Sequence, residues 1–282
     1  MTSREAQVVT RQTLEAAGFD DAAIESALFL CHILGVSETE LYTEPERILS
    51  PSEIKKLKLL TNRRLRHEPL AYIVGLCQFY GHDFRLTRHT FIPRPETELL
   101  VEEAINFTHH YPQNQLTLAD IGTGSGIIAI SLALALPEAR IYATEIDAPA
   151  LKIASINCRR HGVSRRVILL QGNLLEPLPE PVNVIIANLP YVKNDELEKL
   201  DREIANFEPR TALAGGEDGL DIMRQLLPQI RGRLRPKGCL LLEISYNQSQ
   251  AVNSLLACHL PRADIKLIAD LSGIHRVARV VL

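Results

Sequence analysis

The chain has 282 residues, which is long enough for one large domain and a smaller one, and its 46% of hydrophobic residues can build a sizeable core. Its formal net charge is −3 and its isoelectric point is about 6.3, so the chain as a whole has no field that attracts a polyanion. These values argue against a protein that binds duplex DNA by itself.

The cysteines and the N-terminus indicate where the protein works. The five cysteines are scattered and form no Cys-x-x-Cys pair or Cys/His cluster, which predicts reduced core residues and no metal site. The first residues, MTSREAQVVTRQ, lack the apolar core of a signal peptide, and no apolar run approaches the ~20 residues that span a bilayer. We therefore expect a cytoplasmic protein without membrane contact.

Residues 1–75 have the signals of a small helical domain. Two predicted helices end at Gly18 and Gly35, where a C-terminal cap favours glycine. A third begins with Ser50 as N-cap, continues with a proline in the first turn and a glutamate that completes a capping box, and stops before Pro69. Residues 76–95 change to alternation around a Gly-His pair, which predicts a β-hairpin linker.

Residues 96–282 predict a second, larger domain. A helix over 97–110 is followed by alternating strands and helices, which is the pattern of a Rossmann-like, mostly parallel sheet with helices on both faces. The last strand is expected to run antiparallel. We expect seven strands, at 116–122, 140–147, 166–173, 182–190, 238–245, 264–270 and 274–282.

The stretch ADIGTGSG (119–126) joins the first of these strands to a helix. Ligands of open α/β sheets bind beyond the carboxyl ends of the strands, and glycines there allow a close approach to the backbone. A dinucleotide fingerprint requires a third glycine at position 127, where this chain has Ile127, and the Gly-Lys-Ser/Thr of a P-loop is missing. The candidate cofactor-binding residues of this stretch are Asp120, Gly122, Thr123, Gly124, Ser125 and Gly126.

The next two strands end in polar residues that suit a nucleoside. The carboxylate of Glu145 can accept hydrogen bonds from both ribose hydroxyls, and without a phosphate-binding loop S-adenosylmethionine fits best. Asn173 could bond the adenine edge and Leu174 could cover its face, although asparagine is also an ordinary turn residue. Asp147 is more simply a helix N-cap. The alternative is a glycine turn that only packs against a helix, beside a solvated glutamate.

The fourth strand ends in VNVIIANLPYV (182–192), which supplies an acceptor, a rigid ring and an aromatic surface. A planar amide or exocyclic amine nitrogen is a poor nucleophile, so acceptors that align its two N–H groups matter more than a strong base. The side-chain oxygen of Asn188 and the backbone carbonyl of Leu189 can serve, while Pro190 fixes that carbonyl and Tyr191 stacks on the planar group. Asn188 should also border the cofactor. The alternative is that the stretch merely turns the chain out of a strand.

Together these motifs resemble those of class I amino-methyltransferases, whose Asn/Asp-Pro-Pro-Phe/Tyr signature serves both adenine and glutamine methylation. Further stretches resemble the glutamine N5-methyltransferases of peptide chain release factors, the HemK family, and the resemblance covers essentially the whole chain. These stretches are EPLAYIVG (68–75), FIPRPETELLVE (91–102), NLPYV (188–192), FEPRTALAGGEDGLD (207–221) and LLEISYNQSQAV (241–252).

The resemblance implies a class I methyltransferase fold, S-adenosylmethionine as cofactor and the glutamine of the Gly-Gly-Gln loop of release factors as substrate. It implies roles for the signature residues Asn188 and Tyr191, the three glycines and Glu145, and a helical domain that helps to grip the release factor. It also places IPRPETE at the edge of the cavity, with Arg94, Glu96 and Thr97, although these side chains and Glu98 could equally cap the following helix. This chain departs from the family at Leu189, where proline is usual, and at Asn173, where aspartate is usual.

Two other functions stay open from the residues alone. N6-adenine methylation of RNA or DNA uses the same signature, and a module could hold the cofactor on the translation machinery without turnover. The basic helix before Pro69 predicts a solvated amphipathic face, with contact to an acidic protein or to ribosomal RNA as the alternative. The long segment 193–220 is expected to form a lid over the site, and its acidic character disfavours a nucleic acid backbone.

Overall fold

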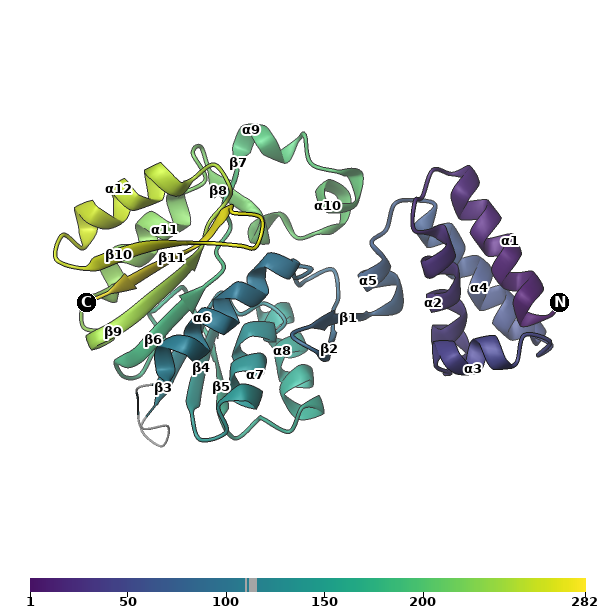
Figure 1. Ribbon diagram of the computed structural model, residues 1–282, viewed down its shortest axis with the longest axis horizontal. Helices are drawn as coiled ribbons and strands as arrows, with labels where there is room; N and C mark the ends of the chain where they lie inside the picture. The colour runs from purple at the N-terminus through teal and green to yellow at the C-terminus, as the bar shows by residue number, and fades with distance from the viewer. Residues whose placement is uncertain (110, 112–115) are drawn as a thin grey trace. The chain divides into compact units, whose positions relative to one another are not determined.

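The protein is described by a computed structural model that covers residues 1–109, 111 and 116–282 (Figure 1). It divides into two compact units. The first unit contains Met1–Gly75 and Asp201–Phe207, and the second contains Leu76–Leu200 and Glu208–Leu282. The chain therefore enters the first unit a second time through a short segment that lies far along the sequence.

The first unit is helical. Three of its helices begin with a complete capping box, in which Thr2, Ser37 and Ser50 each accept from the backbone of a glutamate three residues later. Its core includes Leu14, Phe29, Leu30 and Leu57. The helices are α1 Ser3–Ala16, α2 Ala22–Leu34, α3 Glu38–Thr43, α4 Pro51–Arg64, α5 Leu70–Val74 and, from the second passage, α10 Arg202–Phe207.

The basic residues of α4 do not share one solvated face. Arg64 is buried, binds both carboxylate oxygens of Glu25 at 2.8 and 3.0 Å, and also binds Glu203 at 2.6 Å. Arg63 forms a two-pronged ion pair with Glu68. The prediction of a wholly solvated face is therefore wrong for these two arginines, which are paired inside the unit, where loss of one partner would leave a buried charge uncompensated.

The second unit opens with a β-hairpin of β1 (Leu76–Phe79) and β2 (His82–Arg85). One buried side chain fastens this hairpin to the rest of the unit. The Asn157 carboxamide accepts from the Arg85 backbone N–H at 2.8 Å, and donates to the carbonyls of Arg85 at 3.0 Å and Ser125 at 2.8 Å. The hairpin, the helix that carries Asn157 and the glycine-rich turn are thus tied together.

The main sheet has seven strands in the order β10-β11-β9-β6-β3-β4-β5. The five strands from β9 to β5 are parallel, and β11 pairs antiparallel with both of its neighbours. This confirms the predicted mostly parallel Rossmann-like sheet with an antiparallel last strand. The strands are β3 Thr117–Ile121, β4 Arg140–Glu145, β5 Val167–Gln171, β6 Val182–Ala187, β9 Leu234–Glu243, β10 Asp264–Ala269 and β11 His275–Val281.

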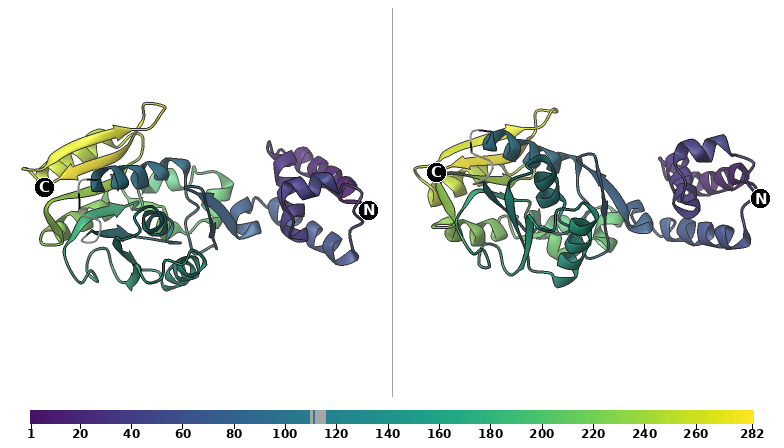
Figure 2. Two further views of the ribbon diagram at one scale, coloured as in Figure 1. Left: turned by 60° about the horizontal axis from the view of Figure 1, so that its bottom comes forward. Right: turned by 90° about the horizontal axis from the view of Figure 1, so that it is seen from below.

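Helices cover both faces of this sheet (Figure 2). On one face α6 (Glu98–Thr108), α7 (Ile127–Ala135) and α8 (Ala148–Arg160) pack on the sheet, and on the other face α11 (Asp221–Leu226) and α12 (Ser249–His259) do so. Within the described ranges, no helix combines the length and apolarity needed to cross a membrane.

Some elements differ from the sequence predictions. The stretch LDIMRQLLPQIRGRL (220–234) predicts one helix, but that helix ends earlier, because Pro228 lacks a backbone N–H and α11 tightens into the 3₁₀ segment Leu227–Ile230. The predicted helix over 97–110 is α6, and position 110 lies outside the described residues. Of the cysteines, Cys158 and Cys239 are buried as expected, whereas Cys258 is exposed.

The segment 193–220 contains regular structure. A small parallel sheet pairs β7 (Val192–Lys193) with β8 (Ala214–Gly216), and α9 (Asn194–Leu197), α10 and the 3₁₀ turn Arg210–Ala212 lie between them in sequence. The pairing brings the end of this segment back to the residues that follow Tyr191.

Candidate active site

The carboxyl ends of β3, β4, β5, β6 and β9 meet at one edge of the sheet, which is where an open α/β sheet binds its ligand. The predicted motifs all follow these strand ends. Residues 122–126 follow β3, Glu145 ends β4, Asn173 follows β5, and Asn188 follows β6. The structure therefore brings together the motifs that the sequence separates.

The glycines at this edge have two different functions. Gly122 and Gly124 both have positive φ angles, of 71° and 56°, and both reach solvent, so they form an accessible floor without side chains. Gly126 is buried, and a Cβ there would lie 3.1 Å from Ile130 and 3.2 Å from Ala154. Two glycines thus allow a ligand to approach, and the third allows helices to pack.

Asp120 lies beneath this floor rather than on it. Its side chain is only 1% exposed, and its Oδ2 accepts from the Thr123 hydroxyl at 2.5 Å and from the Ala129 backbone N–H at 3.1 Å. Burial raises the pKa of Asp120 to about 7. Asp120 and Thr123 therefore shape the turn, and the Ser125 side chain is also buried.

Glu145 keeps unused acceptor capacity at the end of β4. Its Oε2 accepts from the Gly124 backbone N–H and its Oε1 from the Asp147 N–H, both at 2.9 Å. A carboxylate has about four acceptor positions, so two remain for a ligand. Asp147 accepts from the Ala150 N–H and caps α8, which confirms its structural assignment.

The turn after β5 offers less to a ligand than the sequence suggested. The Asn173 side-chain N–H₂ donates to Glu176 at 3.3 Å, which leaves its oxygen as an acceptor. Leu174 is 8% exposed and belongs to the hydrophobic core, with a positive φ of 48°. Only a small part of the Leu174 side chain could cover a base.

The Asn188 carboxamide is oriented by a residue of the IPRPETE stretch. Its Nδ2 donates to the hydroxyl of buried Thr97 at 3.2 Å, which turns its Oδ1 away from that partner. The next residue, Leu189, is 7% exposed, and its Cδ2 lies 3.8 Å from where a Cβ on Gly122 would be. Leu189 thus fills the core where the two motifs meet.

Tyr191 meets a buried carboxylate. Its hydroxyl donates to Oε1 of Glu243, the last residue of β9, at 3.3 Å. Burial raises the pKa of Glu243 to about 7, and burial together with the nearby Glu243 raises the pKa of Tyr191. The phenol therefore stays protonated at neutral pH and can donate this hydrogen bond.

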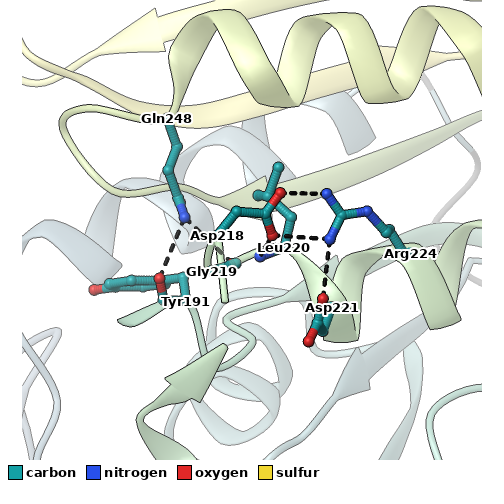
Figure 3. Close-up of polar contacts among 7 residues, drawn as sticks. All are labelled: Tyr191, Asp218, Gly219, Leu220, Asp221, Arg224 and Gln248. Atoms are coloured by element: carbon teal, nitrogen blue, oxygen red, sulfur yellow. Dashed lines mark hydrogen bonds and ion pairs between the residues drawn. The ribbon is translucent and has the colours of Figure 1, made fainter. Parts of the chain in front are cut away.

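The backbone of Tyr191 is also held, through its carbonyl oxygen (Figure 3). The Gln248 side-chain N–H₂ donates to the carbonyls of Tyr191 and Gly219, both at 3.2 Å, and its oxygen accepts from the Ser245 N–H. Beside it, Arg224 pairs with Asp218 and Asp221. These contacts join α11, α12 and the signature loop.

The polar residues of IPRPETE each have a separate partner. Thr97 accepts from Asn188, and within the described part of the chain no side chain caps α6 at its first residue. The alternative that this motif caps the helix is therefore wrong, and the physical reason is that its side chains bind distant strands and loops. The remaining pairs are Arg94 with Glu208 at 2.5 Å, Glu96 with Arg276 at 3.3 Å, and Glu98 with the Tyr80 backbone N–H at 2.7 Å.

Three residues at this edge were missed from the sequence: Glu243, Gln248 and Glu208. Glu243 had a signal, because a charged residue closes the apolar strand LLLE as Glu145 closes its strand. Gln248 and Glu208 lie in stretches that resemble the family, but their residue types gave no signal of their role, since each acts by contacting backbone or side chains far away in sequence.

Comparisons with known proteins match both the helical region and the α/β region of the chain. A family model described as the PrmC N-terminal domain matches residues 5–75, and one described as ribosomal protein L11 methyltransferase (PrmA) matches residues 101–203. A solved methyltransferase from Pyrococcus furiosus has a TM-score of 0.53 at 16% identity, covering 78% of this chain and 98% of its own. That likeness shows the fold alone.

Relatives match over nearly the whole chain. The release factor glutamine methyltransferase of Geobacter sulfurreducens is 37% identical over 269 residues, which cover 95% of this chain and 92% of the relative. The protein of the same name from Moorella thermoacetica is 40% identical over 256 residues, which cover 90% and 89%. This confirms the resemblance found in the motifs, and the chain belongs to the family of release factor glutamine methyltransferases.

Proposed function

We propose that this protein uses S-adenosylmethionine to methylate the side-chain amide nitrogen, N5, of the glutamine in the Gly-Gly-Gln loop of peptide chain release factors. The observation that supports this most strongly is that relatives of this name match the helical region as well as the catalytic region. We also propose that the reaction takes place in the cytoplasm.

The residues at the edge of the sheet fit this cofactor. Gly122 and Gly124 provide the floor, Glu145 keeps two acceptor positions for ribose hydroxyls, and Asn173 keeps one for the adenine edge. When bound, the cofactor supplies an electrophilic methyl carbon on a sulfonium. The buried side chains of Asp120, Thr123 and Ser125 support the floor from below.

The signature residues would hold the substrate amide. Because the Asn188 N–H₂ group binds Thr97, the Asn188 oxygen is the atom left to accept an amide N–H, and the Leu189 carbonyl would accept the second. Two acceptors keep the planar nitrogen in one orientation and favour the positive charge that develops on it. Pro190 restricts Leu189 to an extended backbone, and the half-buried Tyr191 ring offers a stacking surface.

The remaining parts would recognise the release factor. We infer that residues 1–75, together with Asp201–Phe207, grip this protein, that residues 76–95 connect them to the catalytic residues 96–282, and that the rest of segment 193–220 forms a lid. Arg94, Glu96 and Thr97 would border the pocket, since Arg94 and Glu96 are paired but still partly exposed.

One experiment tests the proposal against its alternatives. The protein is incubated with labelled S-adenosylmethionine and, in parallel, with release factor, tRNA, rRNA and DNA, and the methyl group is located by mass spectrometry. We expect label on the glutamine of the Gly-Gly-Gln loop. Label on adenine, or cofactor binding without transfer to any substrate, would overturn the proposal.

A further inference from the structure

Glu243 has an environment that the chemistry described so far does not use. It is 5% exposed and lies at the end of β9, beside the strand that leads into Asn188, because Leu242 pairs with Ala187 of β6. Its Oε1 accepts from Tyr191, whereas its buried Oε2 has no hydrogen-bond partner among the residues that the structure describes. Burying a carboxylate with so few partners costs free energy, so its presence at the site requires an explanation.

Thr97 connects Glu243 to the catalytic carboxamide. The Thr97 hydroxyl is fully buried and accepts from Asn188, so its single proton is left for another acceptor. The buried Oε2 of Glu243, which is unpaired within the described part of the chain, can take this proton, and Thr97 lowers the pKa of Glu243 against the effect of burial, which indicates that the two side chains lie close together. A donation from Thr97 to Glu243 would continue the donation from Asn188 to Thr97 that the structure shows.

We propose that Glu243 is a positioning residue, which fixes the Asn188 carboxamide through Thr97 and the Tyr191 ring through its hydroxyl. The proposal rests on the proposed methylation of glutamine. An acceptor at Glu243 forces the Thr97 hydroxyl to point its proton away from Asn188, and Asn188 must then present N–H₂ to Thr97 and oxygen to the substrate. One carboxylate thus orients both Asn188 and Tyr191, the two side chains that would hold the substrate amide.

The charges around Glu243 make this arrangement sensitive to pH. Burial, together with a smaller effect of Glu96 on the segment before α6, raises the pKa of Glu243 to about 7, against the lowering effects of Thr97, Tyr191 and Arg276 on β11. Arg276 itself is shared with Glu96 and Asp270. Below about pH 7 the protonated carboxyl would become a donor on one oxygen, so kcat should fall as the pH decreases through this value.

The first test replaces Glu243 with glutamine, which keeps the size of the side chain and one acceptor oxygen. We expect Glu243→Gln to lower kcat by about 10- to 100-fold, with KM for a Gly-Gly-Gln peptide and the Kd for S-adenosylmethionine within about threefold of wild type. The fall of kcat near pH 7 should disappear. Glu103→Gln is the matched control, because Glu103 is a partly buried glutamate paired with Arg279 on the same unit, and it should retain wild-type kcat. An unchanged kcat and pH profile in Glu243→Gln would overturn the proposal.

The second test separates positioning from a general structural role. Thr97→Val removes the connecting hydroxyl, and the double variant with Glu243→Gln should be no slower than the slower single variant, because both act on Asn188 through one path. In protein with ¹⁵N-labelled asparagine, the Asn188 side-chain signal, assigned with Asn188→Ala, should shift in Glu243→Gln. An unshifted Asn188 signal would refute the positioning role, whatever the enzyme methylates. Failure of the wild type to methylate glutamine would instead refute only the proposed function.

Discussion

At the scale of single residues, the backbone of Tyr191 depends on glycines that lie far along the chain. A Cβ on Gly215 would lie 2.7 Å from the Tyr191 Cα and 2.8 Å from the Pro190 carbonyl oxygen. A Cβ on Gly219 would lie 2.3 Å from the Tyr191 carbonyl oxygen and 2.5 Å from Gln248 Nε2. The signature loop therefore keeps its shape only while these positions have no side chain.

Gly219→Ala tests this dependence on a missing side chain. We expect it to displace the Tyr191 carbonyl and the Gln248 amide, and to lower kcat by about tenfold or more. Gly232→Ala is the matched control: its φ of 77° is close to the 80° of Gly219, but nothing lies within 4 Å of the new Cβ. Both variants should lose about 1–3 kcal/mol of stability from backbone strain.

Steady-state kinetics and thermal unfolding of the two variants distinguish the effects. A loss of kcat in folded Gly219→Ala but not in Gly232→Ala would show that the close approach matters for catalysis, and Gly219→Ala should also have the larger loss in Tm because its Cβ displaces neighbouring atoms. Equal kcat values in the two variants would mean that the approach of Gly219 to Tyr191 has no catalytic role.

Asp120 provides a pH dependence of stability at the same scale. Because burial raises its pKa from 3.8 to about 7 in the folded protein, the folded state binds more protons than the unfolded state between these values. The contribution of Asp120 to the free energy of unfolding is therefore highest below about pH 4. It decreases as the pH rises to about 7, by an amount of the order of a few kcal/mol. Urea unfolding of wild type and Asp120→Asn at pH 5 and pH 8 measures this, and parallel changes in the two proteins would contradict it.

At the scale of helices and strands, local signals were sufficient for most elements. Capping residues, periodicity and apolar runs predicted the seven strands and the helices around them, because these signals act within a few residues. Pro228 shortened one helix, which a closer use of the same local rule could have predicted. The partners of IPRPETE could not be predicted, since Arg94 binds Glu208 and Glu96 binds Arg276 across most of the domain.

Asn157 couples the hairpin, α8 and the glycine-rich turn, and this coupling predicts the effect of removing its side chain on stability. Asn157→Ala leaves the Arg85 N–H and the carbonyls of Arg85 and Ser125 without their partner, so we expect a loss of about 1–3 kcal/mol in stability. Asn183→Ala is the matched control, because Asn183 bonds the backbone and hydroxyl of Thr117 at the opposite edge of the sheet.

Only Asn157→Ala should also weaken the binding of S-adenosylmethionine, by about tenfold, because only Asn157 touches the turn that forms the cofactor floor. Calorimetric titration of both variants after a check of their folding measures this difference. Equal cofactor affinity in the two variants would show that Asn157 stabilises the fold without shaping the floor.

At the scale of the whole molecule, the sequence predicted only part of the set of residues that make up the helical unit. The helices of residues 1–75 follow from local capping signals, but the inclusion of Asp201–Phe207 depends on a tertiary contact between Glu203 and the buried Arg64. A charged helix in a long acidic segment gives no signal of that partner. The candidate site, in contrast, was largely predictable, because parallel strands bring their carboxyl ends to one edge whatever lies between them in the sequence.

The division into two units predicts that binding of the cofactor and recognition of the release factor can be separated. The glycine floor, Glu145 and the signature residues all belong to the second unit. A chain of residues 76–282 should therefore bind S-adenosylmethionine with an affinity close to that of the full chain, and methylate a short Gly-Gly-Gln peptide at a similar rate. With intact release factor, we expect its KM to rise by about tenfold or more, since the gripping unit is then reduced to Asp201–Phe207. Calorimetry, and kinetics on both substrates, measure these quantities once thermal unfolding has shown that the shortened chain is folded. An unchanged KM for intact release factor would mean that recognition resides wholly in the catalytic unit.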